Sequence, residues 1–188
     1  PSRGVRIAAI IALRRLRSPE VGRFVTDADD AIVLEAARAI NDDGGIDGAL
    51  PALARVLDEK RFTAEPLLRR AISANLKVGT GEAIARLETF AADSARPQGM
   101  RVEAVAALGV WADPSPMDRV DGIYLGQAKP RDTVVPAAQA AVLRLMQAQA
   151  SENAPALRIA LAEAAGRLGA QGAATLLMTQ LQSDTSFN

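Results

Sequence analysis

A short helical pattern that returns along the chain is the feature that most constrains its fold. The pattern is an alanine followed three residues later by a second alanine and then by an apolar residue. It is kept loosely, since Asn75 precedes the leucine of the third copy and Arg167 replaces the second alanine of the last. The first alanines are Ala9, Ala36, Ala71, Ala104 and Ala164, which are 27, 35, 33 and 60 residues apart. Periods of about 20–50 residues are typical of solenoids and other repeat arrays. The copies therefore predict stacked structural repeats.

Two further segments between these copies have helical rather than alternating periodicity. They cover about residues 48–58 and 82–92. In the segment 48–58, the face that we expect to be buried carries Leu50, Leu53, Ala54 and Leu57. The second would direct Arg86 to solvent. Since the recurring helices are apolar around more of their circumference, we expect them to be inner helices with these amphipathic helices outside.

The predicted fold class is all-α. We expect an α-α superhelix, a HEAT- or armadillo-like solenoid of about five helix pairs, as one domain over residues 1–188. Aromatic residues make up only 3% of the chain, so alanine and branched aliphatic side chains must fill the core. The chain opens inside a helical pattern, which indicates a fragment of a longer protein.

Polar residues and glycines mark the expected helix ends. Ser18, Thr63, Thr133 and Asn153 lie shortly before prolines, where a capping side chain and a first-turn proline suit a helix start. Glycines at 44, 45, 79, 169 and 172 are placed to end helices in the left-handed conformation.

An irregular insert over residues 111–132 interrupts the pattern before a helix resumes at about residues 133–149. It contains the single Trp and single Tyr of the chain, with three prolines and two glycines. One interpretation is a connector in which Trp111 and Tyr124 fill a gap and Asp118 and Arg119 bond locally. The other is a docking surface, because aromatic and arginine side chains often anchor interfaces. Its candidate residues are Trp111, Asp118, Arg119, Asp121, Tyr124, Arg131 and Asp132.

The motif that starts with Leu108-Gly109 and continues through Trp111, Pro114, Asp118-Arg119-Val120 and Gly122 carries a family resemblance. With residues 130–132 and the helix ending at 163–169, it resembles the HEAT-repeat region of large membrane-bound dehydrogenases (quinoprotein, sorbosone type) of planctomycete-like bacteria. The resemblance covers about residues 101–172. It implies an exported or periplasmic scaffold between a β-propeller and a haem-binding cytochrome c domain, which hold the redox residues.

Several kinds of chemistry are not supported by the residues present. The chain has no Cys and no His, which removes thiol nucleophiles, histidine triads and most zinc or haem ligation. Residues 42–48 lack the spacing of a calcium loop, and residues 79–81 lack the lysine of a phosphate loop, so both are expected to be turns. No metal, cofactor or catalytic residue is predicted, and no apolar run of about 18 residues suggests membrane insertion.

Charge also argues against nucleic-acid binding. Lys and Arg total 22, as do Asp and Glu, so there is no basic excess to neutralise phosphates. Five arginines cluster near the start, and we interpret them as a polar rim. They are Arg3, Arg6, Arg14, Arg15 and Arg17.

The sequence thus predicts a non-catalytic scaffold or protein-interaction module. Its partner would be a neighbouring domain of the same polypeptide or another protein. The main alternative is a HEAT-like enzyme acting on nucleic acid, similar to some DNA glycosylases, which would require a basic groove and stacking aromatics. A repeat protein of the phycobilin-lyase type shares the architecture, but no residue here indicates it.

Overall fold

The computed structural model describes residues 1–127, 131, 133–149 and 154–183. In these residues the chain is all-helical, with one isolated antiparallel bridge between Met117 and Tyr124 and no named strand. The α-helices are α1 Arg3–Arg15, α2 Asp30–Asn41, α3 Leu50–Ala54, α4 Glu65–Val78, α5 Gly81–Ala92, α6 Gln98–Gly109, α7 Val135–Ala148, α8 Pro155–Leu168 and α9 Ala173–Ser183. The 3-10 helices are η1 Pro19–Thr26, η2 Asp47–Ala49 and η3 Arg55–Asp58.

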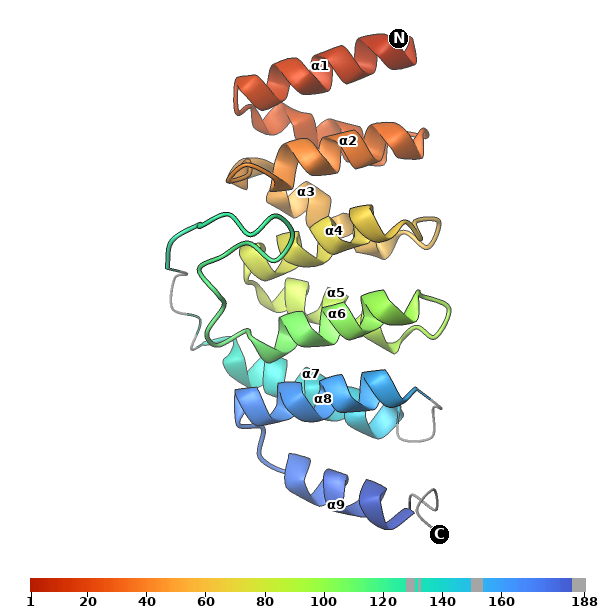
Figure 1. Cartoon of the computed structure of the whole chain (residues 1–188), viewed down its shortest axis with the longest axis vertical. Coiled ribbons are helices and arrows are strands. Elements are labelled where there is room, and N and C mark those ends of the chain that lie inside the picture. Colours follow the sequence, from red (N-terminus) through yellow and green to blue (C-terminus); the bar gives the residue numbers. More distant parts are fainter. Residues whose placement is uncertain (128–130, 132, 150–153, 184–188) are drawn as a thin grey trace.

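The helices alternate between two layers along the long axis of the molecule (Figure 1). Helices α2, α4, α6 and α8 follow one another in the front layer, and each packs against the next. Behind them, η1 contacts α3, η3 contacts α5, and α5 contacts α7. Contacts of α3 with α4, α5 with α6 and α7 with α8 join the layers. The buried side chains form one hydrophobic cluster from Ile10 to Ala173.

The recurring pattern marks the helices of the front layer. Ala36, Ala71, Ala104 and Ala164 are all buried between neighbouring helices, as the pattern predicts. The first copy differs, because Ala9 in α1 is only half-buried. No described helix covers the face of α1 that points away from α2 (Figure 1).

The two amphipathic segments are helical, with two differences from expectation. Residues 47–58 form η2, α3 and η3 in succession rather than one regular helix, although the predicted apolar face is buried. Arg86 on α5 is not directed to solvent. Its side chain is only 17% exposed because it forms an ion pair with Asp58 and donates to Asn75 Oδ1.

Helix ends follow the predicted signals in part. Gly79 and Gly169 adopt the left-handed conformation after α4 and α8, as expected. Ser18 caps a 3-10 helix rather than an α-helix. The helices that begin near Thr63 and Thr133 have no side-chain cap, since their N-cap residues are Ala64 and Val134. Asn153 lies outside the described residues.

Small residues let α6 and α8 approach closely. A Cβ atom built on Gly109 would lie 2.8 Å from Cα and 2.9 Å from Cβ of Ala164. Real Cβ atoms do not approach other atoms so closely, so this contact requires glycine. Close packing of this kind replaces the bulky aromatic contacts that the chain lacks.

Candidate functional site

The insert leaves the end of α6 and turns back along the front layer instead of passing directly to α7 (Figure 1). Its backbone forms a small hairpin in which Asp118 N–H donates to Ile123 O at 2.8 Å and Leu125 N–H to Pro116 O at 2.7 Å. The turn is closed by Asp118 Oδ1, which accepts from the backbone N–H groups of Val120 and Asp121 at 2.7 and 3.1 Å. An aspartate that bonds to N–H groups two and three residues ahead stabilises such a turn locally.

The side chain of Asp118 also reaches two helices of the front layer. Lys77 Nζ, in the last turn of α4, lies 2.6 Å from Oδ2, and the Asp118 side chain is 1% exposed. Ser73 of α4 donates to Oδ2 at 3.3 Å, and Asn41 at the end of α2 donates to Oδ1 at 3.5 Å. Lys77 in turn donates to Asn41 Oδ1 at 2.9 Å. We call Asp118, Lys77, Ser73 and Asn41 the anchor network.

Two further contacts fix the insert at neighbouring positions. Asp121 Oδ2 accepts from the backbone N–H of Asp43, after α2, at 3.1 Å. Arg119 Nε and Nη2 donate to Glu103 Oε1 of α6 at 3.0 and 2.8 Å. Together with the anchor network, these contacts attach one loop to α2, α4 and α6. The hairpin is therefore attached to the front layer at several points.

Trp111 and Arg131 lie at the base of the insert. Trp111 is fully buried, and Arg131 Cζ lies 5.3 Å from the centroid of its ring. The guanidinium also packs on the turn between α4 and α5, because a Cβ built on Gly79 would lie 3.0 Å from Arg131 Nε. Arg131 is thus held between an aromatic ring and a glycine backbone.

The far part of the hairpin exposes apolar side chains. Met117, Ile123, Tyr124 and Leu125 are 44%, 38%, 66% and 42% exposed. We call these four residues the apolar tip. Isolated exposed apolar side chains are normal, whereas a contiguous exposed apolar patch often marks an interaction surface.

The structure divides the candidate interaction residues into two groups. Asp121 and Tyr124 are exposed, and Arg119 and Arg131 are half-buried. Trp111 and Asp118 are buried, so neither side chain lies on a contact surface of the described structure. Arg131 packs on the ring of Trp111, and the anchor network binds Asp118. Asp132 lies outside the described residues. The sequence interpretation missed Lys77, Ser73 and Asn41, and also the exposed Met117, Ile123 and Leu125.

The Lys77–Asp118 pair makes stability depend on pH. Burial raises the pKa of Asp118, but the hydrogen bond from Lys77 and the N–H groups of the turn outweigh it, so the pKa lies below its ordinary value of 3.8. A carboxylate with a lowered pKa in the folded state stabilises the fold above its unfolded pKa and loses this effect as pH falls through its folded pKa.

We therefore expect the difference in unfolding free energy between the wild type and Asp118→Asn to be constant above about pH 5 and to shrink below about pH 4. Urea unfolding at a series of pH values measures it. Both proteins carry the same other carboxylates, so the pH dependence that those groups cause cancels in the difference. A difference that stayed constant down to about pH 2 would contradict the role of Asp118.

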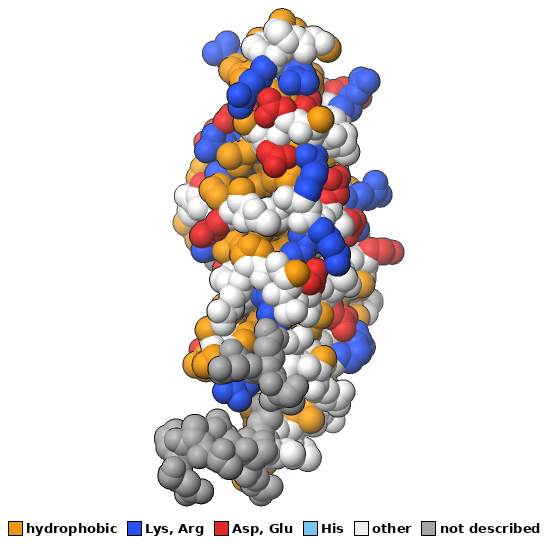
Figure 2. All heavy atoms as spheres, turned by 90° about the vertical axis from the view of Figure 1, so that its right-hand side faces the viewer, with side chains coloured by type: hydrophobic (Ala, Val, Ile, Leu, Met, Phe, Trp, Pro, Cys, Tyr) orange, Lys and Arg blue, Asp and Glu red, His pale blue; other side chains and the backbone are white. Residues whose placement is uncertain are grey.

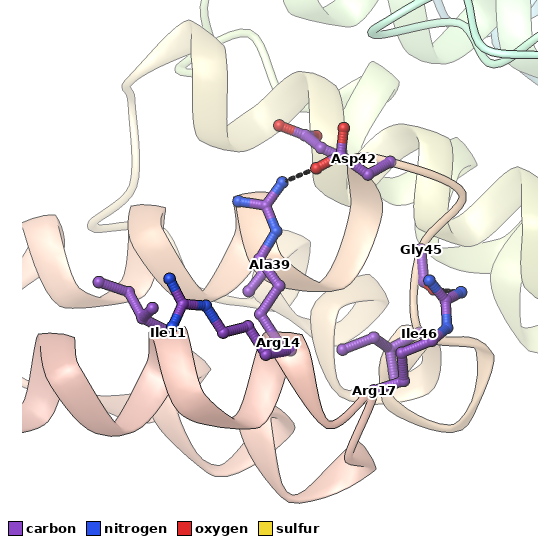
Figure 3. Close-up of a pocket in the computed structure, with 9 residues that line it drawn as sticks. Ile11, Arg14, Arg17, Ala39, Asp42, Gly45 and Ile46 are labelled. Atoms are coloured by element: carbon purple, nitrogen blue, oxygen red, sulfur yellow. Dashed lines mark hydrogen bonds and ion pairs between the residues drawn. The ribbon is translucent and has the colours of Figure 1, made fainter.

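The arginine cluster near the start lies around α1 and α2. Figure 3 shows Arg14 and Arg17 beside a hollow of about 440 Å³ between the ends of these helices. Arg14 forms an ion pair with Asp43, and Arg17 donates to the backbone oxygen of Gly45. Arg3 and Arg6 lie 3.2 and 3.8 Å from Asp29 at the start of α2. The cluster thus ties α1 to its neighbour, which supports the polar-rim interpretation.

Charges of both signs are interspersed on the surface seen in Figure 2, the side that faces right in Figure 1. No continuous cationic groove runs over this face. In the described residues no group of three or more acidic side chains converges for a metal ion. Nor does the described part contain a helix long and apolar enough to span a bilayer. Comparisons with protein-family models, curated proteins and solved structures found no match to this chain.

Proposed function

We propose that this protein is a HEAT-like α-solenoid scaffold whose apolar tip binds another protein or a neighbouring domain of the same polypeptide. The alternation of inner and outer helices supports the solenoid, since each front-layer helix buries its small residues against the next. Repeat proteins of this kind generally act as binding surfaces. On this proposal the domain is not an enzyme and binds no cofactor of its own.

The main support for the proposal is that the apolar tip is exposed on a hairpin whose position is fixed by contacts with the helices. Contacts to α2, α4 and α6 hold the hairpin in place. A surface that is ordered before binding loses little conformational entropy when a partner docks. Tyr124 is the most exposed of the four, and tyrosine is one of the residue types enriched at the centre of such interfaces.

The family resemblance suggests where the partner lies. In dehydrogenases of the type that the 108–122 motif resembles, a β-propeller and a cytochrome c domain flank the repeats. A contact between the apolar tip and one of these domains would place the repeats as a spacer in an exported redox protein. This intramolecular partner is part of the proposal.

Site-specific photo-cross-linking in the natural full-length protein tests the proposal. A benzophenone amino acid at position 124 should give a cross-link that maps to one segment of a neighbouring domain or of one partner protein. The matched control is position 159, because Ile159 on α8 is 61% exposed against 66% for Tyr124. Ile123→Asp in the same protein should abolish the cross-link from position 124.

Two outcomes would contradict the proposal. One is a cross-linking yield at position 124 no higher than at position 159. The other is a yield that Ile123→Asp leaves unchanged, since a charge inside an apolar contact should weaken it by about tenfold or more.

A further inference from the structure

A groove separates the insert from the ends of α3 and α4. Its volume is about 750 Å³, within the range of about 300–1,000 Å³ that is usual for small-molecule sites. The walls expose more apolar than polar surface. The apolar residues among them include Leu50, Pro51, Leu76, Val78, Met117 and Leu125. We call this space the insert groove.

Most of the charges in the insert groove are already neutralised. Lys77 pairs with Asp118, and Arg119 pairs with Glu103. Asp47 is an exposed residue at the start of η2, where water screens its charge. Arg131 differs from these residues, because no ion pair or hydrogen bond in the described structure engages its guanidinium.

Arg131 is also restrained in position. Its guanidinium lies between the Trp111 ring and the Gly79 backbone, and its Nη1 atom is buried without an acceptor. Trp111 Nε1 is buried without an acceptor as well. Burial lowers the pKa of Arg131 from its ordinary value, although an arginine stays charged at neutral pH. A half-buried charge without a counter-ion is unfavourable unless an anion binds to it.

A carboxylate is the complement of this group. Its two oxygens match the fork of N–H donors on a guanidinium, and such paired hydrogen bonds are stronger than neutral ones. The apolar side chains that line the same groove suit a hydrocarbon body. We propose that the insert groove binds a small organic acid, with its carboxylate on Arg131 and its apolar body against Met117 and Leu125. This site shares Met117 and Leu125 with the apolar tip, but the proposal does not depend on protein binding by the tip.

Nuclear magnetic resonance provides a direct test, because the chain has one Trp and so one indole N–H signal. Titration of the whole chain with hexanoate should shift this signal, and the shift should saturate. Hexanamide, the uncharged match, should give no saturable shift. Arg131→Gln should weaken hexanoate binding by about tenfold or more, since a hydrogen bond to a charged group is lost.

A second variant tests whether Arg131→Gln weakens binding only because it changes the structure of the loop. Leu125→Ser leaves Arg131 in place, so it should weaken hexanoate binding while leaving the weaker acetate binding unchanged. The proposal is overturned if hexanoate gives no saturable shift, if hexanamide gives the same shift, or if Arg131→Gln binds as the wild type does. Tighter binding of the peptide acetyl-Leu-Glu-Leu-amide than of hexanoate would also overturn it, in favour of a protein segment as ligand.

Discussion

Replacement of Asp118 by alanine is expected to lower the free energy of unfolding by about 3–5 kcal/mol. The variant leaves Lys77 without its carboxylate, 16% exposed at the end of α4. It also removes the acceptor for the backbone N–H groups of Val120 and Asp121. A largely buried cation that has lost its counter-ion destabilises more than the loss of an ordinary surface pair would. Urea unfolding followed by circular dichroism measures the effect.

The matched control is Asp113→Ala, because Asp113 is an exposed residue of the same insert. We expect this change to alter stability by no more than about 0.5 kcal/mol. The double variant Lys77→Met/Asp118→Leu removes both charges, so it should be more stable than Asp118→Ala alone. A double variant as unstable as the sum of the single changes would show that the pair is not the source of the effect.

Replacement of Gly109 by alanine is expected to lower the free energy of unfolding by about 2–3 kcal/mol. The added methyl group would lie 2.8 Å from Ala164 Cα, so α6 and α8 would have to move apart. Backbone atoms cannot rotate away from such a contact as a flexible side chain can. The denaturation midpoint of the variant, measured at an unchanged denaturant slope, gives the loss.

Gly99 supplies the control in the same helix. A Cβ built there meets nothing within 4 Å, so Gly99→Ala adds no clash. Alanine favours a helix interior over glycine by up to about 1 kcal/mol, so this variant should be neutral or more stable. The same substitution thus has opposite expected signs at the two positions. Equal effects at positions 99 and 109 would contradict the close approach of α6 and α8.

The sequence allowed the helical class to be predicted because its signal is local. Ala71 and Ala104 recur at positions that place small side chains on the packed face of each helix, and periodicity alone reveals this. The exposure of Arg86 was predicted incorrectly for the opposite reason. Its partner Asp58 lies 28 residues earlier, on η3, and nothing near Arg86 in the sequence indicates that contact.

The candidate site could be predicted only in part. The prolines, glycines and single aromatic residues made residues 111–132 recognisable as an irregular segment. The partners of Asp118 could not be found this way, because they depend on the path that the insert takes back to α4 and α2. Asn75 had a visible signal, since it interrupts an apolar pattern. It lies buried and donates to the backbone oxygens of Ala54 and Ala71.

The anchor network also constrains the order in which the chain can fold. Asn41 and Asp118 are 77 residues apart in sequence, and Asp43 and Asp121 are 78 apart. Contacts between residues so far apart form slowly, because a long loop must close first. The insert can dock only after α2, α4 and α6 have assembled, so its docking is a late step. Because the docked hairpin bonds to all three helices, we expect them to open together in hydrogen exchange rather than one layer at a time.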